Sequence, residues 1–177
     1  MALLSGWSKG YAAETALSCA SMAKLDGASL PQVADIKAAL LRARHVYVIG
    51  RDTGYGAAHE IALKLKECCA LHAEAYSSSE VLHGPLQLAT NPLTVLILDT
   101  GAAHIQDSLD QAESRFRGAG CDVLRVRTAD VGAGHMTPAA SAACLLMLLY
   151  PVILETALAL GLNPDAPSTL AKVTQTI

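Results

Sequence analysis

Short runs of apolar residues alternate along this chain with longer stretches in which apolar and polar residues are mixed. Four short runs, rich in Val, Ile and Leu or alternating in polarity, are predicted to be strands: 45–50, 71–76, 93–98 and 121–126. Three longer stretches are predicted to be helices: 55–69, 104–118 and 137–161. Because strands and helices that alternate form βαβ units, we predict an α/β fold, a three-layer α/β/α sandwich around a parallel sheet.

Two further helices are predicted ahead of the first strand, at 8–24 and 32–43, with a turn that ends at Pro31 between them. We therefore divide the chain into a helical lead-in at 1–44 and a main domain at 45–162.

The last segment, 163–177, has a different pattern from the rest. It follows Gly161 and contains Pro164 and Pro167, so it cannot continue the preceding helix. We expect a separate C-terminal tail that is held extended.

The Leu-rich segment Met136–Leu154 carries no formal charge, so a membrane span has to be weighed. The segment is near the lower length limit for a span, and Pro138, Ser141 and Pro151 interrupt it. Glu155 follows directly. We favour a buried helix that packs against protein.

The composition narrows the class of ligand. Charged residues make up 16% of the chain and the net charge is −3, so no basic face for nucleic acid is expected. Five cysteines without CxxC spacing argue against a disulfide framework and a zinc site, and they fit a reducing cytoplasm. The N-terminus lacks the pattern of a signal peptide. A small polar metabolite is the expected ligand, and no cofactor is predicted.

Ligands of parallel α/β sheets bind at the carboxyl ends of the strands, which directs attention to Gly50–Gly56 and Thr100–His104. The turn at Gly50–Gly56 leads from a strand into a helix and can present backbone N–H groups to an anion. A tight turn needs glycine for backbone reasons as well, so the motif is weak evidence when it stands alone.

The helix that follows carries Glu60, Lys64 and Glu67 at i, i+4 and i+7, so these three side chains share one face. An exposed ladder of salt bridges would have the same spacing. A carboxylate beside a lysine also suits reversible proton transfer at carbon, and the helix begins at the ligand-binding end of the sheet.

Two histidines stand out in the region after this helix. His83 lies in a polar loop before a Gly-Pro turn, and His72 lies near the start of a predicted strand. We expect the partner of His72 to be a backbone group rather than a metal. No pair of histidines has metal-ligand spacing along the chain, so no metal site is predicted.

Four blocks of sequence resemble one known family. They are 60–67 (EIALKLKE), 72–76 (HAEAY), 80–85 (EVLHGP) and 170–172 (LAK). Their order is similar to that in the second SIS (sugar isomerase) domain of glutamine:fructose-6-phosphate aminotransferase and in related glucosamine-6-phosphate deaminases. The resemblance covers about residues 45 to 177, and it implies a SIS domain of flavodoxin-like topology at 45–162.

The resemblance also implies roles for individual residues. Glu67 would move a proton between C1 and C2 of an open-chain sugar phosphate, and Lys172 would form a Schiff base with the ketose carbonyl. His83 would assist ring opening in the active site of a neighbouring subunit, and Lys64 would hold sugar hydroxyls and tune Glu67. The substrate-binding residues implied beside these four catalytic ones are Glu60, Thr53 and Ala171.

The chain departs from the family pattern in ways that affect function. The family binds phosphate through a Ser- and Thr-rich loop of the first SIS domain, whereas the equivalent turn here has Thr100 next to Asp99, whose carboxylate would repel phosphate. Ser168 also stands where the synthases usually have Arg. We therefore expect an isomerase or deaminase half-site in a homo-oligomer, a dimer in the simplest case, or beside a partner SIS domain. A regulatory module that only binds sugar phosphate, and an inactive remnant, are the alternatives.

Overall fold

The computed structural model describes residues 10, 12–25, 30–134 and 136–170. Its centre is a sheet of four parallel strands in the order β2-β1-β3-β4. Their bounds are β1 His45–Gly50, β2 His72–Ser77, β3 Thr94–Asp99 and β4 Asp122–Arg127. The chain leaves β1 in one direction to form β2 and returns to the other side of β1 for β3, so the order reverses between β1 and β3.

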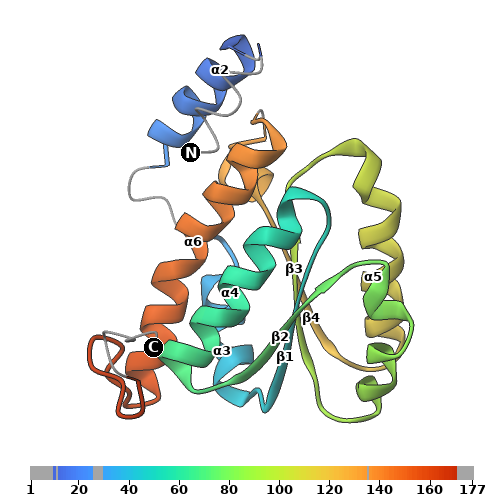
Figure 1. The fold of residues 1–177 in the computed structure, drawn as a ribbon, viewed down its shortest axis with the longest axis vertical. Coiled ribbons are helices and arrows are strands. Elements are labelled where there is room, and N and C mark those ends of the chain that lie inside the picture. Colours follow the sequence, from blue (N-terminus) through green and yellow to red (C-terminus); the bar gives the residue numbers. More distant parts are fainter. Residues whose placement is uncertain (1–9, 11, 26–29, 135, 171–177) are drawn as a thin grey trace, which may run out of the picture.

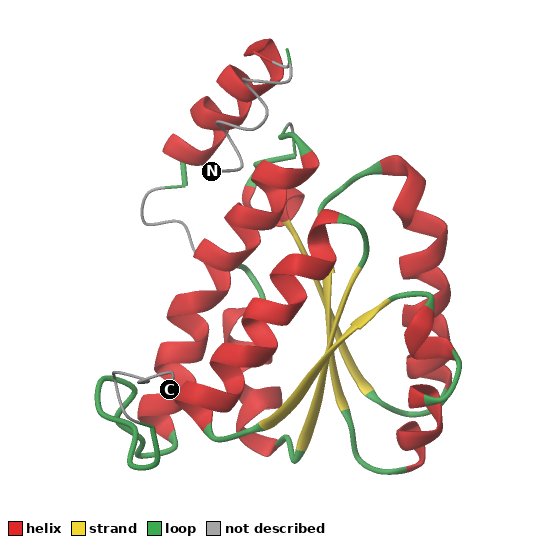
Figure 2. Cartoon of the chain, viewed as in Figure 1, coloured by secondary structure: helices red, strands yellow, loops and turns green. Residues whose placement is uncertain are grey.

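Helices cover both faces of this sheet, so the predicted three-layer α/β/α fold with a parallel sheet is confirmed (Figures 1 and 2). One face carries α3 (Val33–Arg42), α4 (Thr53–Cys69) and α6 (Pro138–Ala159). The other carries α5 (Gln106–Gly118) and two short 3-10 helices, η1 (Glu80–Leu82) and η2 (Pro85–Thr90). Two further 3-10 turns, η3 (Ala103–Ile105) and η4 (Thr128–Val131), follow β3 and β4.

The predicted strands match the observed ones to within one residue. The run at 45–50 is β1 as predicted, and each of the other three strands begins and ends one residue later than its apolar run. The shift for β3 and β4 adds a charged residue, Asp99 or Arg127, whose backbone pairs across the sheet in spite of its polar side chain. Strand ends are set by backbone hydrogen bonds, which a hydrophobic pattern reports only indirectly.

Side chains of successive strand residues enter two separate apolar clusters, one on each face of the sheet. Val46 and Val48 of β1 join the cluster beneath α3, α4 and α6, while Tyr47 and Ile49 join the cluster beneath α5. α3 belongs to the first cluster, since Ile36 is fully buried in it. α2 (Ala12–Ala23) lies beyond the far end of α6 and touches it through Ser18 Oγ, which accepts the Thr137 N–H at 3.0 Å (Figure 1).

The Leu-rich segment forms α6, which is long and apolar enough by length and composition to cross a membrane. Eleven of its 22 residues are nevertheless buried against protein, as the sequence predicted for this helix. Pro138 starts the helix. Pro151 was expected to interrupt the helix, but the helix continues through it, and Pro151 lies on the exposed side. On an exposed face, water can take the place of the hydrogen bond that a proline cannot donate. The helix ends at Ala159, and Gly161 beyond it has φ +75°. The helix therefore does not continue past Gly161, as the sequence predicted.

A buried ionic cluster fixes α5 to the sheet. Arg125 of β4, whose side chain is 5% exposed, binds Asp99 of β3 at 2.9 Å and also bonds Asp110 and Glu113 of α5. Arg127 approaches the same Asp99 carboxylate at 3.3 Å. The Asp99 carboxylate is therefore paired with two guanidinium groups inside the protein.

Candidate active site

The three charged residues predicted to share a face of α4 do so. Lys64 Nζ lies 2.6 Å from Glu67 Oε2 and 3.7 Å from Glu60 Oε1. The Tyr150 hydroxyl of α6 donates to the same oxygen of Glu60 at 2.9 Å. All three charged side chains are about one third exposed, at 32% to 35%. The ladder therefore lies along the seam between α4 and α6, where it is accessible to a solute.

The charges in this ladder are strongly coupled. The hydrogen bond from Lys64 to Glu67 raises the pKa of Lys64 above its usual value, and the charge of Glu60 adds to this effect. Burial raises the pKa of the Tyr150 hydroxyl, and its hydrogen bond to Glu60 raises it further. Lys64 thus remains a cation and Tyr150 a neutral donor at neutral pH, so Glu67 has a permanent positive charge at hydrogen-bond distance.

Glu67 also lines a cavity at the end of α4, whose volume is about 430 Å³. The opposite wall is the tail that follows α6, from Gly161 to Leu170. Ala171 and Lys172, assigned to substrate binding and Schiff-base formation by resemblance, lie outside the described residues. The described part of the tail nevertheless runs beside Glu67 and leads toward them.

Glu67 stands at the opposite end of α4 from the ligand-binding edge that the sequence analysis singled out. Fourteen residues separate it from Thr53, which at the helical rise corresponds to about 20 Å. Thr53 begins α4 beside the carboxyl end of β1, whereas the last turns of α4, which carry Glu67, lead to the edge where β2 begins (Figure 1). Within one chain, Thr53 and Glu67 therefore do not share a site.

The turn at the start of α4 is held tightly by its own backbone. A Cβ on Gly50 would stand 2.2 Å from the Gly54 carbonyl oxygen, so this position admits only glycine. Asp52 adopts φ 52°, a left-handed conformation that is uncommon outside glycine. The hydroxyls of Thr53 and Thr100 are both buried without a hydrogen-bond partner. The backbone requirement accounts for Gly50, whereas a Cβ on Gly56 would meet open space.

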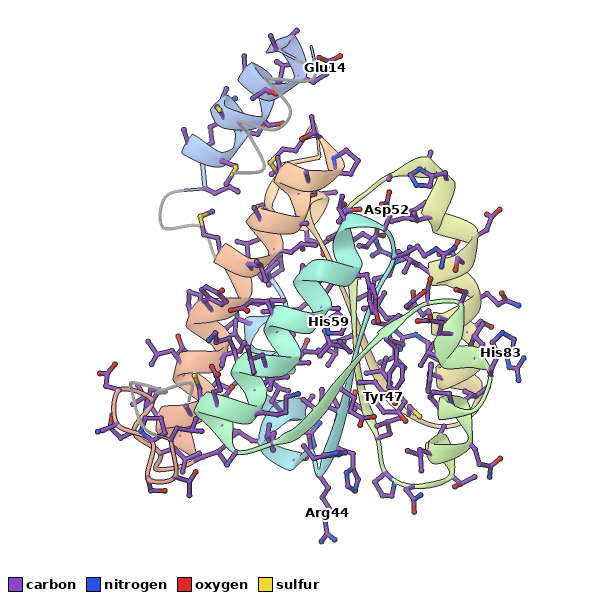
Figure 3. All side chains as sticks on the ribbon, in the orientation of Figure 1. Glu14, Arg44, Tyr47, Asp52, His59 and His83 are labelled. Carbon is purple, nitrogen blue, oxygen red and sulfur yellow. The ribbon has the colours of Figure 1, made fainter. Side chains whose placement is uncertain are left out.

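His83 follows η1 and is exposed. Figure 3 places it beside α5, on the opposite side of the sheet from α4 and its acidic ladder. A sheet and two apolar clusters thus separate His83 from Glu67 in the same chain. The chain by itself does not bring His83, Glu67 and Thr53 together.

Sequence reasoning did not identify two contributions to this region. Tyr150 was assigned only to an apolar helix, although it bonds Glu60 across 90 residues of sequence. The partner of His72 is the side chain of His45, 3.2 Å away, so the expected backbone partner is wrong. Both contacts depend on which elements become neighbours, and no local motif signals them.

Comparison with known proteins places this geometry in context. Residues 39–121 match the family model described as SIS domain. The chain is 34% identical over 141 residues to a glutamine–fructose-6-phosphate aminotransferase (isomerizing) of Symbiobacterium thermophilum, a match that covers 72% of this chain and 22% of the relative. The corresponding protein of Thermus thermophilus is 32% identical over 157 residues, a match that covers 80% of this chain and 25% of the relative.

Solved structures show the same fold. The glucosamine-6-phosphate deaminase of Thermotoga maritima superposes with a TM-score of 0.62 at 24% identity, covering 84% of this chain and 47% of that one. The C-terminal domain of the glucosamine-fructose-6-phosphate aminotransferase of Francisella tularensis superposes with a TM-score of 0.63 at 22% identity. The match covers 90% of this chain and 47% of that one. The chain thus spans about a quarter of the length of these two curated relatives and about half of these two solved structures.

Proposed function

We propose that this chain, of which residues 39–121 match the SIS domain model, supplies one half of a phosphosugar isomerase active site. The reaction proposed is the interconversion of ketose and aldose forms of an amino-sugar phosphate, of the aminotransferase or deaminase type. The observation that carries the proposal is the Glu67–Lys64 pair, in which Glu67 lines a 430 Å³ cavity that the C-terminal tail also lines.

In this proposal Glu67 is the base. Its carboxylate moves a proton between C1 and C2 of the open-chain sugar phosphate. The intermediate between the two proton transfers is an enediol or an enolamine. Lys64, whose pKa is raised by its hydrogen bond to Glu67, stays charged throughout. It donates a hydrogen bond to Glu67 and can donate to sugar hydroxyls, with Glu60 beside it as a further hydrogen-bond acceptor.

Lys172 is proposed to form the Schiff base with the ketose carbonyl. The described tail supports this role, because Leu170 lines the same cavity as Glu67. Lys172 follows Leu170 by two residues, and two residues of chain span at most about 7 Å. Ala171 would contact the sugar from the same segment. An imine at C2 makes the C1 proton more acidic, and Glu67 then needs to be only a modest base.

His83 is proposed to act in the active site of a neighbouring subunit or partner SIS domain. Its position across the sheet from Glu67 supports this division, because a single copy presents the two residues on opposite faces. The exposed side of α6 offers a surface for such assembly: Met147, Tyr150, Leu154 and Leu158 are 42% to 59% exposed there. A dimer or a SIS pair would cover this apolar strip and complete the site.

Deuterium exchange tests the proposal directly. The chain, or the assembly it forms with a phosphate-binding SIS domain, is incubated with fructose 6-phosphate in deuterated water, and NMR follows the C1 hydrogens. We expect one C1 hydrogen to exchange slowly with deuterium, and we expect Glu67→Gln to abolish this exchange. Glu155→Gln, which changes an exposed carboxylate of α6 that pairs with Lys37, is the matched control and should exchange normally.

Borohydride reduction supplies the second half of this experiment. Treatment with fructose 6-phosphate and borohydride should attach the sugar to Lys172, as read by peptide mass spectrometry, and Lys172→Met should remain unlabelled. Binding without exchange or trapping would identify the chain as a sugar-phosphate sensor. Exchange that persists in Glu67→Gln would reject Glu67 as the base while leaving an isomerase in place.

A further inference from the structure

Two histidines that are far apart in sequence lie side by side at the edge where the strands begin. His45 is the first residue of β1 and His72 the first residue of β2, and the two are paired in the parallel register. Their Nδ1 atoms are 3.2 Å apart, and their ring centroids 5.4 Å apart with the rings nearly perpendicular. Both residues are exposed, so the pair is open to a solute.

The local field at this edge favours a cation. α3 ends at Arg42, three residues before His45, and α4 ends at Cys69, three residues before His72. The C-terminal end of a helix carries a partial negative charge of about half an elementary charge. Arg44 is the nearest positive residue along the chain, and its side chain extends away from the sheet into solvent (Figure 3).

The spacing of the two nitrogens matches a chelate. Late transition metals bind imidazole nitrogen at about 2.0–2.1 Å, so two nitrogens 3.2 Å apart subtend an angle of about 100° at a shared ion. That value lies between the octahedral and the tetrahedral angle. A single histidine offers no such advantage.

The surroundings leave room for the remaining ligands. The two histidines line a cavity of about 120 Å³ together with Tyr47, Leu93 and neighbouring residues of the loop after η2. Among the described residues, no third His, Cys, Asp or Glu completes a set of three. Water would therefore occupy the other coordination positions, as it does in open metal sites.

We propose that His45 and His72 form a binding site for a divalent late transition-metal ion, such as Zn²⁺ or Ni²⁺. Imidazole suits these ions, whereas Mg²⁺ and Ca²⁺ require oxygen ligands. The ion bridges β1 to the edge strand β2 at their first residues, and it thereby holds the edge of the sheet in register. The expectation that no metal site exists came from spacing along the chain, and it could not detect a pair created by strand pairing.

Ni²⁺ titration of the full 177-residue chain tests this site. Calorimetry at pH 7.5 should show one Ni²⁺ bound per chain, and His45→Gln and His72→Gln should each weaken binding about tenfold or more. Loss of an outer-shell partner alone typically costs 10- to 100-fold in metal affinity, and a direct ligand should cost at least as much. His59→Gln, at an exposed histidine of α4 in edge-to-face contact with Tyr55, is the matched control and should bind as the wild type does.

A measurement on the unmodified chain guards against variants that fold poorly. Bound Ni²⁺ is paramagnetic when octahedral, so amide signals from the first residues of β1 and β2 should broaden first in a ¹H–¹⁵N spectrum. Binding should weaken at pH 5.5, because protons compete with the metal for the same nitrogens. Equal affinity in wild type, His45→Gln and His72→Gln, or broadening centred elsewhere in the chain, would overturn the proposal.

Discussion

Replacing Arg125 by methionine should destabilise this fold more than any substitution at an exposed ion pair. The Arg125 side chain is 5% exposed and binds Asp99, which is 2% exposed, at 2.9 Å. Methionine fills a similar volume but leaves the Asp99 carboxylate buried without its main counter-charge. Breaking a buried pair in this way costs about 3–5 kcal/mol.

Three groups that remain around Asp99 should keep the loss near the lower end of this range. The Gly101 N–H donates to the carboxylate at 2.8 Å, Gln106 at 2.9 Å and Arg127 at 3.3 Å. A loss of about 3 kcal/mol is a large share of the 5–15 kcal/mol that stabilises a typical domain. With a urea dependence of about 2 kcal/mol/M, it lowers the urea midpoint by about 1.5 M.

Urea denaturation followed by far-UV circular dichroism measures this change. Arg117→Met is the matched control, because Arg117 is 52% exposed and pairs with Glu113 on the surface of α5, where such pairs contribute less than about 1 kcal/mol. Adding Asp99→Asn to Arg125→Met removes the uncompensated charge and should restore part of the loss. A urea midpoint for Arg125→Met within about 0.3 M of the wild-type midpoint would refute this account of the cluster. A shift of that size is on the order of what an ordinary surface substitution causes.

The same cluster predicts how stability depends on pH. Burial by itself would raise the pKa of Asp99, but hydrogen bonds from Gln106 and Gly101 and the charge of Arg125 outweigh it, and the pKa is lowered. A carboxyl group with a lowered pKa in the folded state stabilises the fold above its unfolded pKa, near 4, and this contribution is lost as the pH falls through the folded value. Stability should therefore decline below about pH 4, and more gently in Arg125→Met.

Two further substitutions test the backbone turn and the assembly surface. Gly50→Ala should prevent soluble folding, since its Cβ would meet the Gly54 carbonyl oxygen at 2.2 Å, whereas Gly56→Ala meets open space and should stabilise α4 by about 0.5–1 kcal/mol in a urea titration. A wild-type midpoint for Gly50→Ala would contradict the turn geometry. Leu154→Glu, at a residue 48% exposed on α6, should convert an oligomer into monomer in light scattering without changing the circular dichroism spectrum. An unchanged particle mass would show that this face is not the interface.

The hydrophobic pattern was sufficient to locate the elements of the fold. Runs of buried Val, Ile and Leu identify the strands because every residue of a central parallel strand such as β3 is covered by helices on both faces. The spacing of Glu60, Lys64 and Glu67 likewise predicts their contact, since residues three and four apart on a helix are neighbours in any context. These inferences hold because their causes are local.

The arrangement of the candidate site required the tertiary structure. Helical geometry could have indicated that Thr53 and Glu67 lie at opposite ends of α4, but the position of His83 across the sheet depends on which face η1 packs against. The pairing of His45 with His72 follows from strand register, and the Tyr150–Glu60 bond follows from the packing of α6 on α4. Contacts of this kind join residues 27 or more positions apart. Local periodicity determined the helices and strands of this protein, whereas its long-range contacts were decided by the packing of those elements against one another.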